Sequence, residues 1–508
     1  MTRRDFSERG DRLRTLLVFT VLQAFLLTVN PHLLPMWSGE ASAVRQALQP
    51  AGTDIQPLYF LLARLCLKLT GAGDPLKSLR LLSALFTVCA TILLERLWLR
   101  KIATETHQWV LLLWAFSPAM LLFGRMAQSY SLQALLTVIA IGSLLRFKED
   151  SSSWKRLAAL AASLIALLYT DYLPGLAVWA AANTLLLAGR PAAAAANQVP
   201  RPMLWKTALL PNLIVAAAFL PGILTLASAL PRWHRDPYSL TGNGFLEAAL
   251  KLAAGFYSLV FGEAIPIWLL ALSAIVAGPY LWILAGTARA HRQWLLPSAT
   301  LALLGYAGAA YWVSYPFMGA RLLFLLPLFI VTVAAGIVET GRLGTVFGVA
   351  LFAAGAGGVW SYFEARDMIN IAYVAPQQQI AGAIARRSVP ADTVVWVDGL
   401  NMDEAVLAYY LPAGFAVRVL RSGSDAGAAW NEVEGNPGVR HVWFLRSQQD
   451  TSPGQTFEKL EKRMLDSWHY RTLYPYVPAP AAYRLVLTLV MRVAQPPRYL
   501  YQLWEFRR

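Results

Sequence analysis

The chain has 508 residues, of which 57% are hydrophobic and only 14% are charged, and its formal net charge is +15. A soluble protein of this length would have about a quarter of its residues charged, so the composition argues against a soluble enzyme and indicates a membrane protein with many helical spans. The positive charge does not indicate nucleic-acid binding, because the basic residues form short clusters between apolar runs, which orients a multispan protein.

Eleven apolar runs are long enough to be interpreted as membrane spans. The first has no small-residue cleavage site after it, so we interpret it as an uncleaved span. In chain order the predicted spans are Leu13–Asn30, Leu79–Leu99, Gln108–Phe123, Ser129–Phe147, Leu157–Thr170, Tyr172–Ala188, Trp205–Pro221, Glu263–Ala285, Trp294–Val313, Arg321–Glu339 and Leu343–Tyr362.

The distribution of lysine and arginine predicts the orientation of these spans. If the N-terminus is cytoplasmic, all six inner segments contain basic residues, as the positive-inside rule requires. The outer segments then include two long loops, 31–78 and 230–262. We therefore expect a multi-pass protein of the cytoplasmic (inner) membrane, with residues 1–362 forming the transmembrane domain.

The first outer loop contains an apolar run, "QPLYFLLARLCLKLTGAG", that is too short to span comfortably. Arg64 and Lys68 are four residues apart in it and share one helical face. This pattern predicts a helix that lies in the membrane interface, with its charges at the level of the lipid headgroups.

Residues 363–508 are mixed and polar, which is typical of a small domain. Strands are predicted over 392–399 and 439–447, and helices over 401–411 and 456–468. Alternation of strands and helices predicts a soluble α/β domain, and eleven spans from a cytoplasmic start place it outside the cytoplasm.

Five charged residues lie at the outer ends of spans or in outer loops, namely Glu40, Asp54, Arg125, Asp171 and Arg321. Charge at membrane depth is costly, so together they suggest a polar cavity that handles anions. The alternative is that they are loop charges in contact with water and headgroups. A carboxylate can deprotonate an acceptor and cationic side chains can hold a phosphate, so transfer from a lipid-anchored phosphate donor fits.

Four segments resemble motifs of the polytopic GT-C glycosyltransferases. They are "QPLYFLLARLCLKLTGAGDPLKSLRLLSALFTV", "FSPAMLLFGRMAQSYSLQALL", "LLYTDYLPGL" and "MGARLLFLLPLFIVTVAAGI". In order and spacing they are similar to the protein mannosyltransferases, the aminoarabinose transferase of lipid A and the bacterial group with RgtA/B/C/D-like domains.

The resemblance implies a polyprenyl-phosphate-linked sugar as donor, an inverting direct displacement and a catalytic carboxylate in the first outer loop. The family commonly has an Asp-Glu pair there, but this chain has Gly39 before Glu40. Glu40 and Asp54 are therefore the two candidate bases, and either one could contact the acceptor instead.

Further residues are predicted to bind substrate, and some depart from the family pattern. Gln56 stands where the family has proline, and Asp171 replaces a histidine. Asp171 could pair with an amine on the sugar, or it could cap a helix. His234 and Arg235 belong to a loop interpreted either as substrate-facing or as a solvated turn. The full predicted set is Arg45, Gln56, Tyr59, Arg64, Lys68, Arg125, Tyr130, Asp171, His234, Arg235 and Arg321.

The sequence thus predicts a membrane glycosyltransferase that moves a sugar from a polyprenyl-phosphate donor to a glycolipid, polysaccharide or protein acceptor outside the membrane. We expect no obligatory metal or other cofactor, because cationic side chains can stabilise a phosphate leaving group. The alternatives are a lipid or sugar transporter or flippase, and a non-catalytic member of the family in envelope assembly.

Overall fold

A computed structural model describes residues 3–49, 57–71, 73–188, 201–229, 245–266, 318–365, 367–398, 404–420, 423–447, 455–468, 470–489 and 496–508, with scattered positions between 268 and 308. It divides into two compact units. The helical unit comprises Met1–Pro31, Gln46–Glu263 and Leu269–Tyr362, and the sheet unit comprises His32–Arg45, Ala264–Trp268 and Phe363–Arg508.

Within the described residues, five helical segments are long and apolar enough to cross a membrane, or six if a bent pair counts as one span. The five are α4 (Pro75–Leu97), α7 (Tyr130–Glu149), Leu209–Ala227 of α10 (Arg201–Ala229), Gly319–Glu339 and α15 (Gly341–Glu364). The predicted span Trp294–Val313 lies almost wholly outside the described residues. The α-helical membrane class is confirmed, whereas the count of eleven spans stays a prediction.

The remaining helices of the helical unit are shorter or more polar. They are α1 (Arg3–Thr28), α3 (Pro57–Thr70), α8 (Trp154–Thr170), α9 (Tyr172–Ala188) and α11 (Phe245–Phe261). Helix α2 (Ser38–Leu48) was not predicted, and the division between the two units falls within it.

The span predicted over Gln108–Phe123 is not one straight helix. The structure has α5 (Thr104–Ala115) and α6 (Pro118–Arg125), which are bent by 50° relative to each other. Pro118 starts α6, where its missing N–H costs nothing, and Ser117 Oγ accepts a hydrogen bond from the backbone N–H of Met120 at 3.2 Å. The sequence "SP" therefore begins a new helix.

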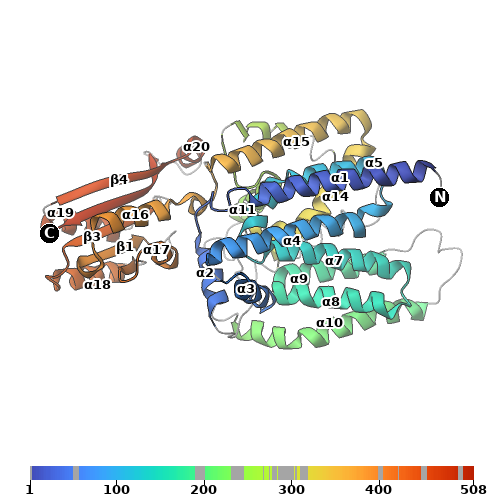
Figure 1. The fold of residues 1–508 in the computed structure, drawn as a ribbon, viewed down its shortest axis with the longest axis horizontal. Coiled ribbons are helices and arrows are strands. Elements are labelled where there is room, and N and C mark those ends of the chain that lie inside the picture. Colours follow the sequence, from blue (N-terminus) through green and yellow to red (C-terminus); the bar gives the residue numbers. More distant parts are fainter. Residues whose placement is uncertain are drawn as a thin grey trace. The chain divides into compact units, whose positions relative to one another are not determined.

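Helix α7 occupies the middle of the helical unit. It packs against α4, α6, α8 and α9, and against the short 3₁₀ helix η4 (Gly319–Leu325), which leads into α14 (Leu326–Glu339) (Figure 1). Most of its side chains are buried, which explains why its sequence is apolar on every face.

Side-chain hydrogen bonds also link the helices. Thr91 of α4 donates to Gln23 of α1 and accepts from the indole of Trp114 of α5 at 2.7 Å. Such polar contacts hold helices together where the surrounding lipid offers no hydrophobic driving force.

The sheet unit contains a five-stranded sheet in the order β2-β1-β3-β5-β4 (Figure 1). The first three strands, β1 (Thr393–Asp398), β2 (Ala416–Leu420) and β3 (His441–Ser447), are parallel. The last two, β4 (Tyr470–Pro478) and β5 (Tyr499–Arg507), are antiparallel to their neighbours. The predicted strands and helices are confirmed, whereas β2, β4 and β5 were missed.

Helices cover both faces of this sheet. They are α16 (Gln377–Arg387), α17 (Glu404–Tyr410), α18 (Gly423–Glu434) and α19 (Gln455–Ser467). Helix α20 (Ala481–Leu489) follows β4 in the chain. The chain crosses from β1 to β2 through α17, and then from β2 past β1 to β3 through α18. Because such crossovers are right-handed, the two helices lie on opposite faces of the sheet. Trp396 and Phe444 belong to the cluster with α18 and α19. On the other face, Trp443 donates to Ser388 just after α16.

Gly358 offers a test of the packing around the break between α5 and α6. A Cβ atom at this position of α15 would lie 2.6 Å from Pro118 Cγ and 2.9 Å from the carbonyl oxygen of Phe261. We expect Gly358→Ala to lower the free energy of unfolding by about 1–3 kcal/mol, because overpacking outweighs the gain in helix propensity. The control is Gly10→Ala in α1, where a Cβ meets nothing within 4 Å. Thermal unfolding in detergent should leave that control unchanged or more stable, and equal behaviour of the two variants would contradict the packing.

Candidate functional site

A buried ion pair lies at the end of the helical unit where α8 gives way to α9. Asp171, between these helices, is 1% exposed. Its Oδ2 atom accepts hydrogen bonds from Gln133 Nε2 at 3.0 Å and from Arg321 Nη1 at 3.2 Å. Asp171 thus contacts α7 and η4 through its side chain, which goes beyond the capping role that the sequence allowed.

Gln133 orients this carboxylate. Its side-chain amide also donates to Ser129 Oγ at 3.0 Å, one turn earlier at the start of α7. Removing one partner of a buried charge pair costs far more than removing an exposed one, so Asp171 and Arg321 depend on each other. Arg321, whose side chain is 20% exposed, also keeps a route to solvent.

Two tyrosines accompany the pair. Tyr130 is buried in the first turn of α7. Tyr306 is fully buried and interacts electrostatically with Asp171, Arg321 and Tyr130. Tyr130 was among the predicted residues, whereas Gln133 and Tyr306 were not.

Two buried arginines hold the backbone just beyond α1. Arg125, the last residue of α6, donates to the carbonyl oxygens of Val29 at 3.0 Å and Asn30 at 2.6 Å. Arg80 of α4 donates to the carbonyl oxygen of Pro31 at 2.6 Å. A cation at the C-terminal end of a helix is favoured by the helix dipole. These contacts give Arg125 a structural role beside the phosphate-binding role predicted for it.

Arg80 was not predicted as a site residue, although the sequence carried the signal. It is the arginine of "RLLSALF", within a segment whose resemblance to the GT-C motif was recognised. It is 6% exposed, which is rare for an arginine unless its charge is used.

Helix α3 confirms the helix expected within the first outer loop, whereas its position at the membrane interface stays a prediction. Tyr59 is buried on its inner face, while Leu61, Leu65 and Leu69 are exposed on the opposite face. Lys68 is exposed as well. An amphipathic helix with exposed leucines and a nearby lysine suits a position at the membrane surface.

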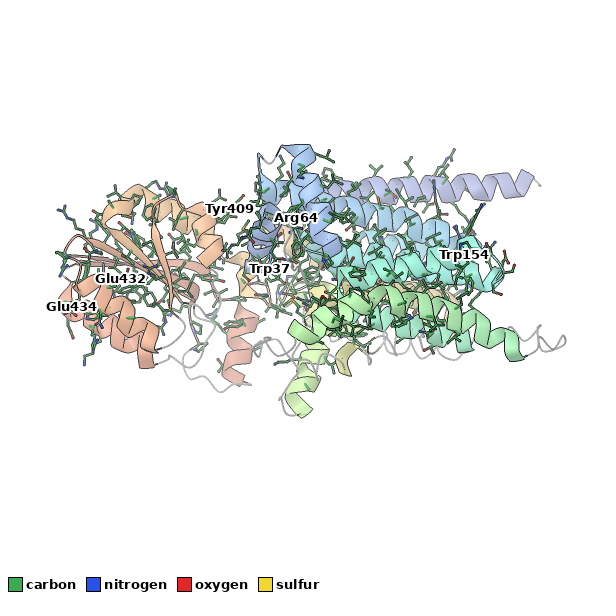
Figure 2. All side chains as sticks on the ribbon, turned by 90° about the horizontal axis from the view of Figure 1, so that it is seen from below. Trp37, Arg64, Trp154, Tyr409, Glu432 and Glu434 are labelled. Carbon is green, nitrogen blue, oxygen red and sulfur yellow. The ribbon has the colours of Figure 1, made fainter. Side chains whose placement is uncertain are left out.

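Arg64 points from α3 to the end of α2 rather than outward (Figure 2). Its guanidinium donates to the carbonyl oxygens of Gln46 and Gln49, both at 3.2 Å. Arg45 is exposed on α2. The remaining predicted residues of the two outer loops, Asp54, Gln56, His234 and Arg235, lie outside the described residues.

Glu40 belongs to the sheet unit. It lies in the first turn of α2 and is 1% exposed. The segment before it is anchored within that unit: Met36 N donates to Tyr410 Oη at 3.2 Å, and the Trp37 ring packs edge-on against Tyr373 with centroids 5.4 Å apart. The candidate base is therefore carried by a segment that folds with the C-terminal residues.

The structure explains why glycine occupies position 39. A Cβ at this position would lie 2.5 Å from atoms of the Trp37 ring, so no side chain fits there while Trp37 stays on Tyr373. The position of the Trp37 ring therefore disfavours the aspartate that the family resemblance led us to expect before Glu40.

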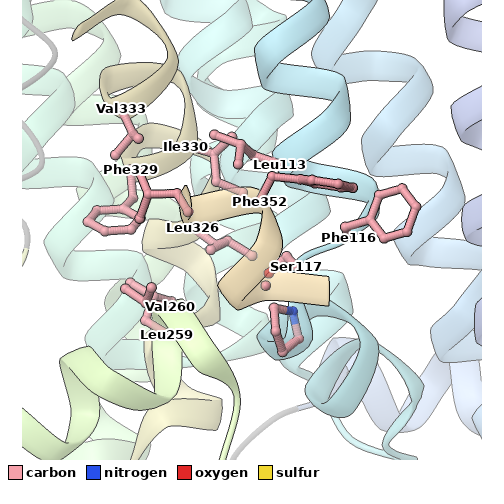
Figure 3. Close-up of a pocket in the computed structure, with 13 residues that line it drawn as sticks. Leu113, Phe116, Ser117, Leu259, Val260, Leu326, Phe329, Ile330, Val333 and Phe352 are labelled. Atoms are coloured by element: carbon pink, nitrogen blue, oxygen red, sulfur yellow. The ribbon is translucent and has the colours of Figure 1, made fainter. Parts of the chain in front are cut away.

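An apolar pocket of about 50 Å³ lies beside the break between α5 and α6 (Figure 3). Its walls come from α5, α6, α11, α14 and α15, and Ser117 is its polar member. The pocket suits part of a hydrocarbon chain and offers nothing to hold a phosphate or a sugar. The other residues that line it are Leu113, Phe116, Pro118, Leu259, Val260, Leu326, Phe329, Ile330, Val333, Leu351, Phe352 and Gly355.

The structure therefore brings Tyr130, Asp171 and Arg321 together in the helical unit, with Arg125 at the end of the preceding helix. Among the described residues there is no group of three or more histidine, cysteine or acidic side chains that could hold a metal ion. The expectation of a metal-independent reaction stays a prediction.

Comparison with solved structures identifies the fold. The chain is similar to ArnT from Cupriavidus metallidurans in the apo state, with 12% identity and a TM-score of 0.53 over 96% of this chain and 97% of that one. The values are the same for ArnT bound to undecaprenyl phosphate. The archaeal oligosaccharyltransferase AglB from Archaeoglobus fulgidus, in complex with an inhibitory peptide and a dolichol-phosphate, is 10% identical, with a TM-score of 0.53 over 98% and 88% of the two chains.

No family model matches the sequence, and no curated protein matches it. The likeness to solved structures covers nearly the whole chain and confirms the GT-C fold that the motifs suggested.

The clash at Gly39 can be tested directly. We expect Gly39→Ala and Gly39→Asp to lower the free energy of unfolding by about 1–3 kcal/mol, because each places a Cβ against the Trp37 ring. A second change, Trp37→Ala, should remove most of the additional cost of Gly39→Asp. Gly382→Ala on α16 is the control, since a Cβ there meets nothing within 4 Å. Thermal unfolding that shows no rescue by Trp37→Ala would contradict the explanation.

A double-mutant cycle tests the coupling of Asp171 to Arg321. We expect Asp171→Asn and Arg321→Gln each to destabilise the protein by about 1–3 kcal/mol, with a coupling energy of about 1 kcal/mol or more, because the carboxylate is buried. Denaturant titration in detergent gives these values. The exposed pair Arg418–Glu432, at 3.0 Å, is the matched control and should couple by less than about 1 kcal/mol. Equal coupling in the two cycles would show that burial contributes nothing.

Proposed function

We propose that this protein is a membrane glycosyltransferase that moves a sugar from a polyprenyl-phosphate donor to an acceptor on the outer side of the cytoplasmic membrane. The observation that carries the proposal is the buried Asp171–Arg321 pair with Gln133, at one end of a helical unit with the GT-C fold. Two proteins of similar fold, ArnT and AglB, have structures that contain undecaprenyl phosphate and a dolichol-phosphate, respectively.

Charge placement supports an anionic substrate at this end of the unit. A charge inside a membrane protein is costly and marks a functional site by default. Arg321 is the described cation best suited to a phosphate, because it is partly exposed and its position is set by a buried carboxylate. A guanidinium held in this way can bind two phosphate oxygens at once and stabilise the charge of a leaving phosphate.

The proposed reaction is a direct displacement at the anomeric carbon. The acceptor oxygen or nitrogen forms the new bond, the bond between the anomeric carbon and the phosphate oxygen breaks, and polyprenyl phosphate leaves with the electron pair. A carboxylate accepts the proton of the acceptor. Glu40 and Asp54 remain the candidates for this base.

The described geometry gives the two candidates different support. Glu40 is buried on a segment anchored by Trp37 and Tyr410, so its position is determined. Its burial suits a group that must meet an acceptor away from bulk water. Asp171 is occupied by Arg321 and Gln133, and we assign it to positioning the arginine.

The hydrocarbon part of the donor needs an apolar surface. The pocket beside the α5–α6 break has apolar walls and a size that admits a few methylene groups. Together with the exposed leucines of α3, it offers apolar contact for a lipid tail.

A transfer assay distinguishes the proposal from the non-catalytic and transporter alternatives. Purified protein is incubated with radiolabelled polyprenyl-phosphate sugars and membrane acceptors. We expect transfer by the wild type, and a loss of about 100-fold or more for Glu40→Gln if Glu40 is the base. Asp54→Asn is made in parallel, because the larger loss identifies the base.

Two controls separate chemistry from folding. Arg321→Gln should lower transfer through weaker donor binding, whereas Lys155→Gln, at the start of α8, should leave transfer unchanged. Unchanged transfer by the Glu40→Gln, Asp54→Asn double variant, in protein that melts like the wild type, would overturn the assignment of the base. Absence of transfer by the wild type with every donor would favour the non-catalytic alternative.

A further inference from the structure

A fully buried carboxylate lies on the inner strand β5 of the sheet unit, remote in sequence from every predicted site residue. Glu505 of β5 is 0% exposed. Its Oε1 atom accepts from Arg507 Nε and Nη2, both at 2.7 Å, and its Oε2 atom accepts from Tyr474 Oη at 2.9 Å. These contacts satisfy both oxygens, so the carboxylate serves as a fixed anchor.

Arg387, in the last turn of α16, approaches the same carboxylate without reaching it. Its Nη1 atom lies 3.9 Å from Glu505 Oε2, beyond hydrogen-bond distance, because Arg507 and Tyr474 take the closer positions. Its guanidinium lies over the Tyr474 ring, 4.5 Å from the centroid. Its side chain is still 43% exposed. The arginine is thus oriented by a ring and a distant charge, while its outer edge faces solvent.

In the same unit, Arg418 is a surface arginine whose guanidinium is bound by a carboxylate of the protein, that of Glu432. Two guanidinium nitrogens of Arg418 donate to the two oxygens of Glu432, at 3.3 and 3.0 Å. Glu432 lies on the exposed side of α18 (Figure 2). There a carboxylate accepts two hydrogen bonds from the guanidinium, whereas in the described part of the chain the carboxylate recorded beside Arg387, that of Glu505, stays 3.9 Å away.

Two further donors adjoin Arg387. Arg386 is exposed, and its Nε atom folds back to the carbonyl oxygen of Gly382 at 3.0 Å. Tyr476, half-buried on β4, interacts electrostatically with both arginines. Burial raises the pKa of its hydroxyl, against the lowering effect of Arg387 and Arg386, so it stays a hydrogen-bond donor at neutral pH.

Basic residues in the last turn of a helix often serve only to complement the helix dipole. Arg386 fits that explanation, because it binds a carbonyl of its own helix. Arg387 does not, since it points to the sheet, where a ring and a buried carboxylate orient it. An oriented and partly exposed guanidinium is the usual partner of a phosphate group.

We infer that Arg387 and Tyr476 form a phosphate-binding site on the sheet unit, anchored by Glu505. The ligand class is a phosphate ester, carried either by a phospholipid headgroup or by a phosphorylated saccharide. The site is built from residues of the sheet unit alone, and the inference does not rest on the proposed transfer reaction.

The test uses the full chain in neutral detergent. Inorganic phosphate is titrated calorimetrically against wild type, Arg387→Gln and Tyr476→Phe, with chloride at matched ionic strength as the blank. We expect saturable binding by the wild type and a loss of about tenfold or more for Arg387→Gln, because a charge-assisted hydrogen bond is removed. Tyr476→Phe should weaken binding less, since it removes a neutral donor. Arg418→Gln is the matched control and should bind like the wild type.

A second arm identifies the source of the phosphate. Native mass spectrometry counts the phosphatidylglycerol molecules that the protein retains from doped micelles, with phosphatidylcholine as the comparison. If lipid retention is lost in Arg387→Gln and kept in Arg418→Gln, the ligand is a lipid headgroup. If Arg387→Gln leaves lipid retention unchanged but weakens the binding of inorganic phosphate, the ligand is a soluble phosphate ester. Binding of phosphate and lipid that is equal in wild type and Arg387→Gln, with equal melting temperatures, would overturn the inference.

Discussion

Burying a charged side chain away from water is costly, and this cost determines how the buried charges of this protein are paired. In the helical unit, Asp171 can stay buried because Arg321 and Gln133 supply hydrogen bonds to one of its oxygens. Arg80 and Arg125 can stay buried because the carbonyl oxygens just beyond α1 accept hydrogen bonds from their guanidinium groups. Each solution joins helices that are distant in sequence, so the polar contacts that make the site possible also define how the helix ends assemble.

The same rule operates in the sheet unit with a different outcome. Glu505 is buried and accepts hydrogen bonds from Arg507 and Tyr474. Arg387 is therefore oriented by the Glu505 carboxylate at 3.9 Å without a hydrogen bond to it. In both units a buried carboxylate therefore fixes an arginine that remains partly exposed. Because each of these side chains is already ordered, an anionic ligand would bind it at a low cost in side-chain entropy.

Much of the fold could be predicted because hydrophobic runs and strand–helix alternation are local signals. The membrane class, the first and third strands and the GT-C resemblance came from such signals. Pro118 signalled the break between α5 and α6, but the apolar run on both sides of it led us to predict one continuous span. The antiparallel strands β4 and β5 were missed because prolines and charges interrupt their pattern, and their stability comes from pairing with each other and with β3.

The site was only partly predictable for a similar reason. Asp171 and Arg321 stood out as charges next to spans, but their pairing spans 150 positions and no local pattern encodes it. Gln133 was overlooked because an uncharged amide in an apolar helix gives no signal. Gly39 was recognised as a departure from the family, yet its cause, the Trp37 ring, depends on a fold of the backbone that spacing does not reveal.

The anchoring of residues 32–45 in the sheet unit has a consequence for biosynthesis. Met36 and its partner Tyr410 are 374 positions apart, so at roughly 5–20 residues per second the ribosome needs about 20–75 seconds to supply the partner. Until then Trp37 and Glu40 lack their native neighbours in the sheet unit. A nascent or truncated molecule that ends before Tyr410 therefore lacks the contact that holds Met36, four residues before Glu40.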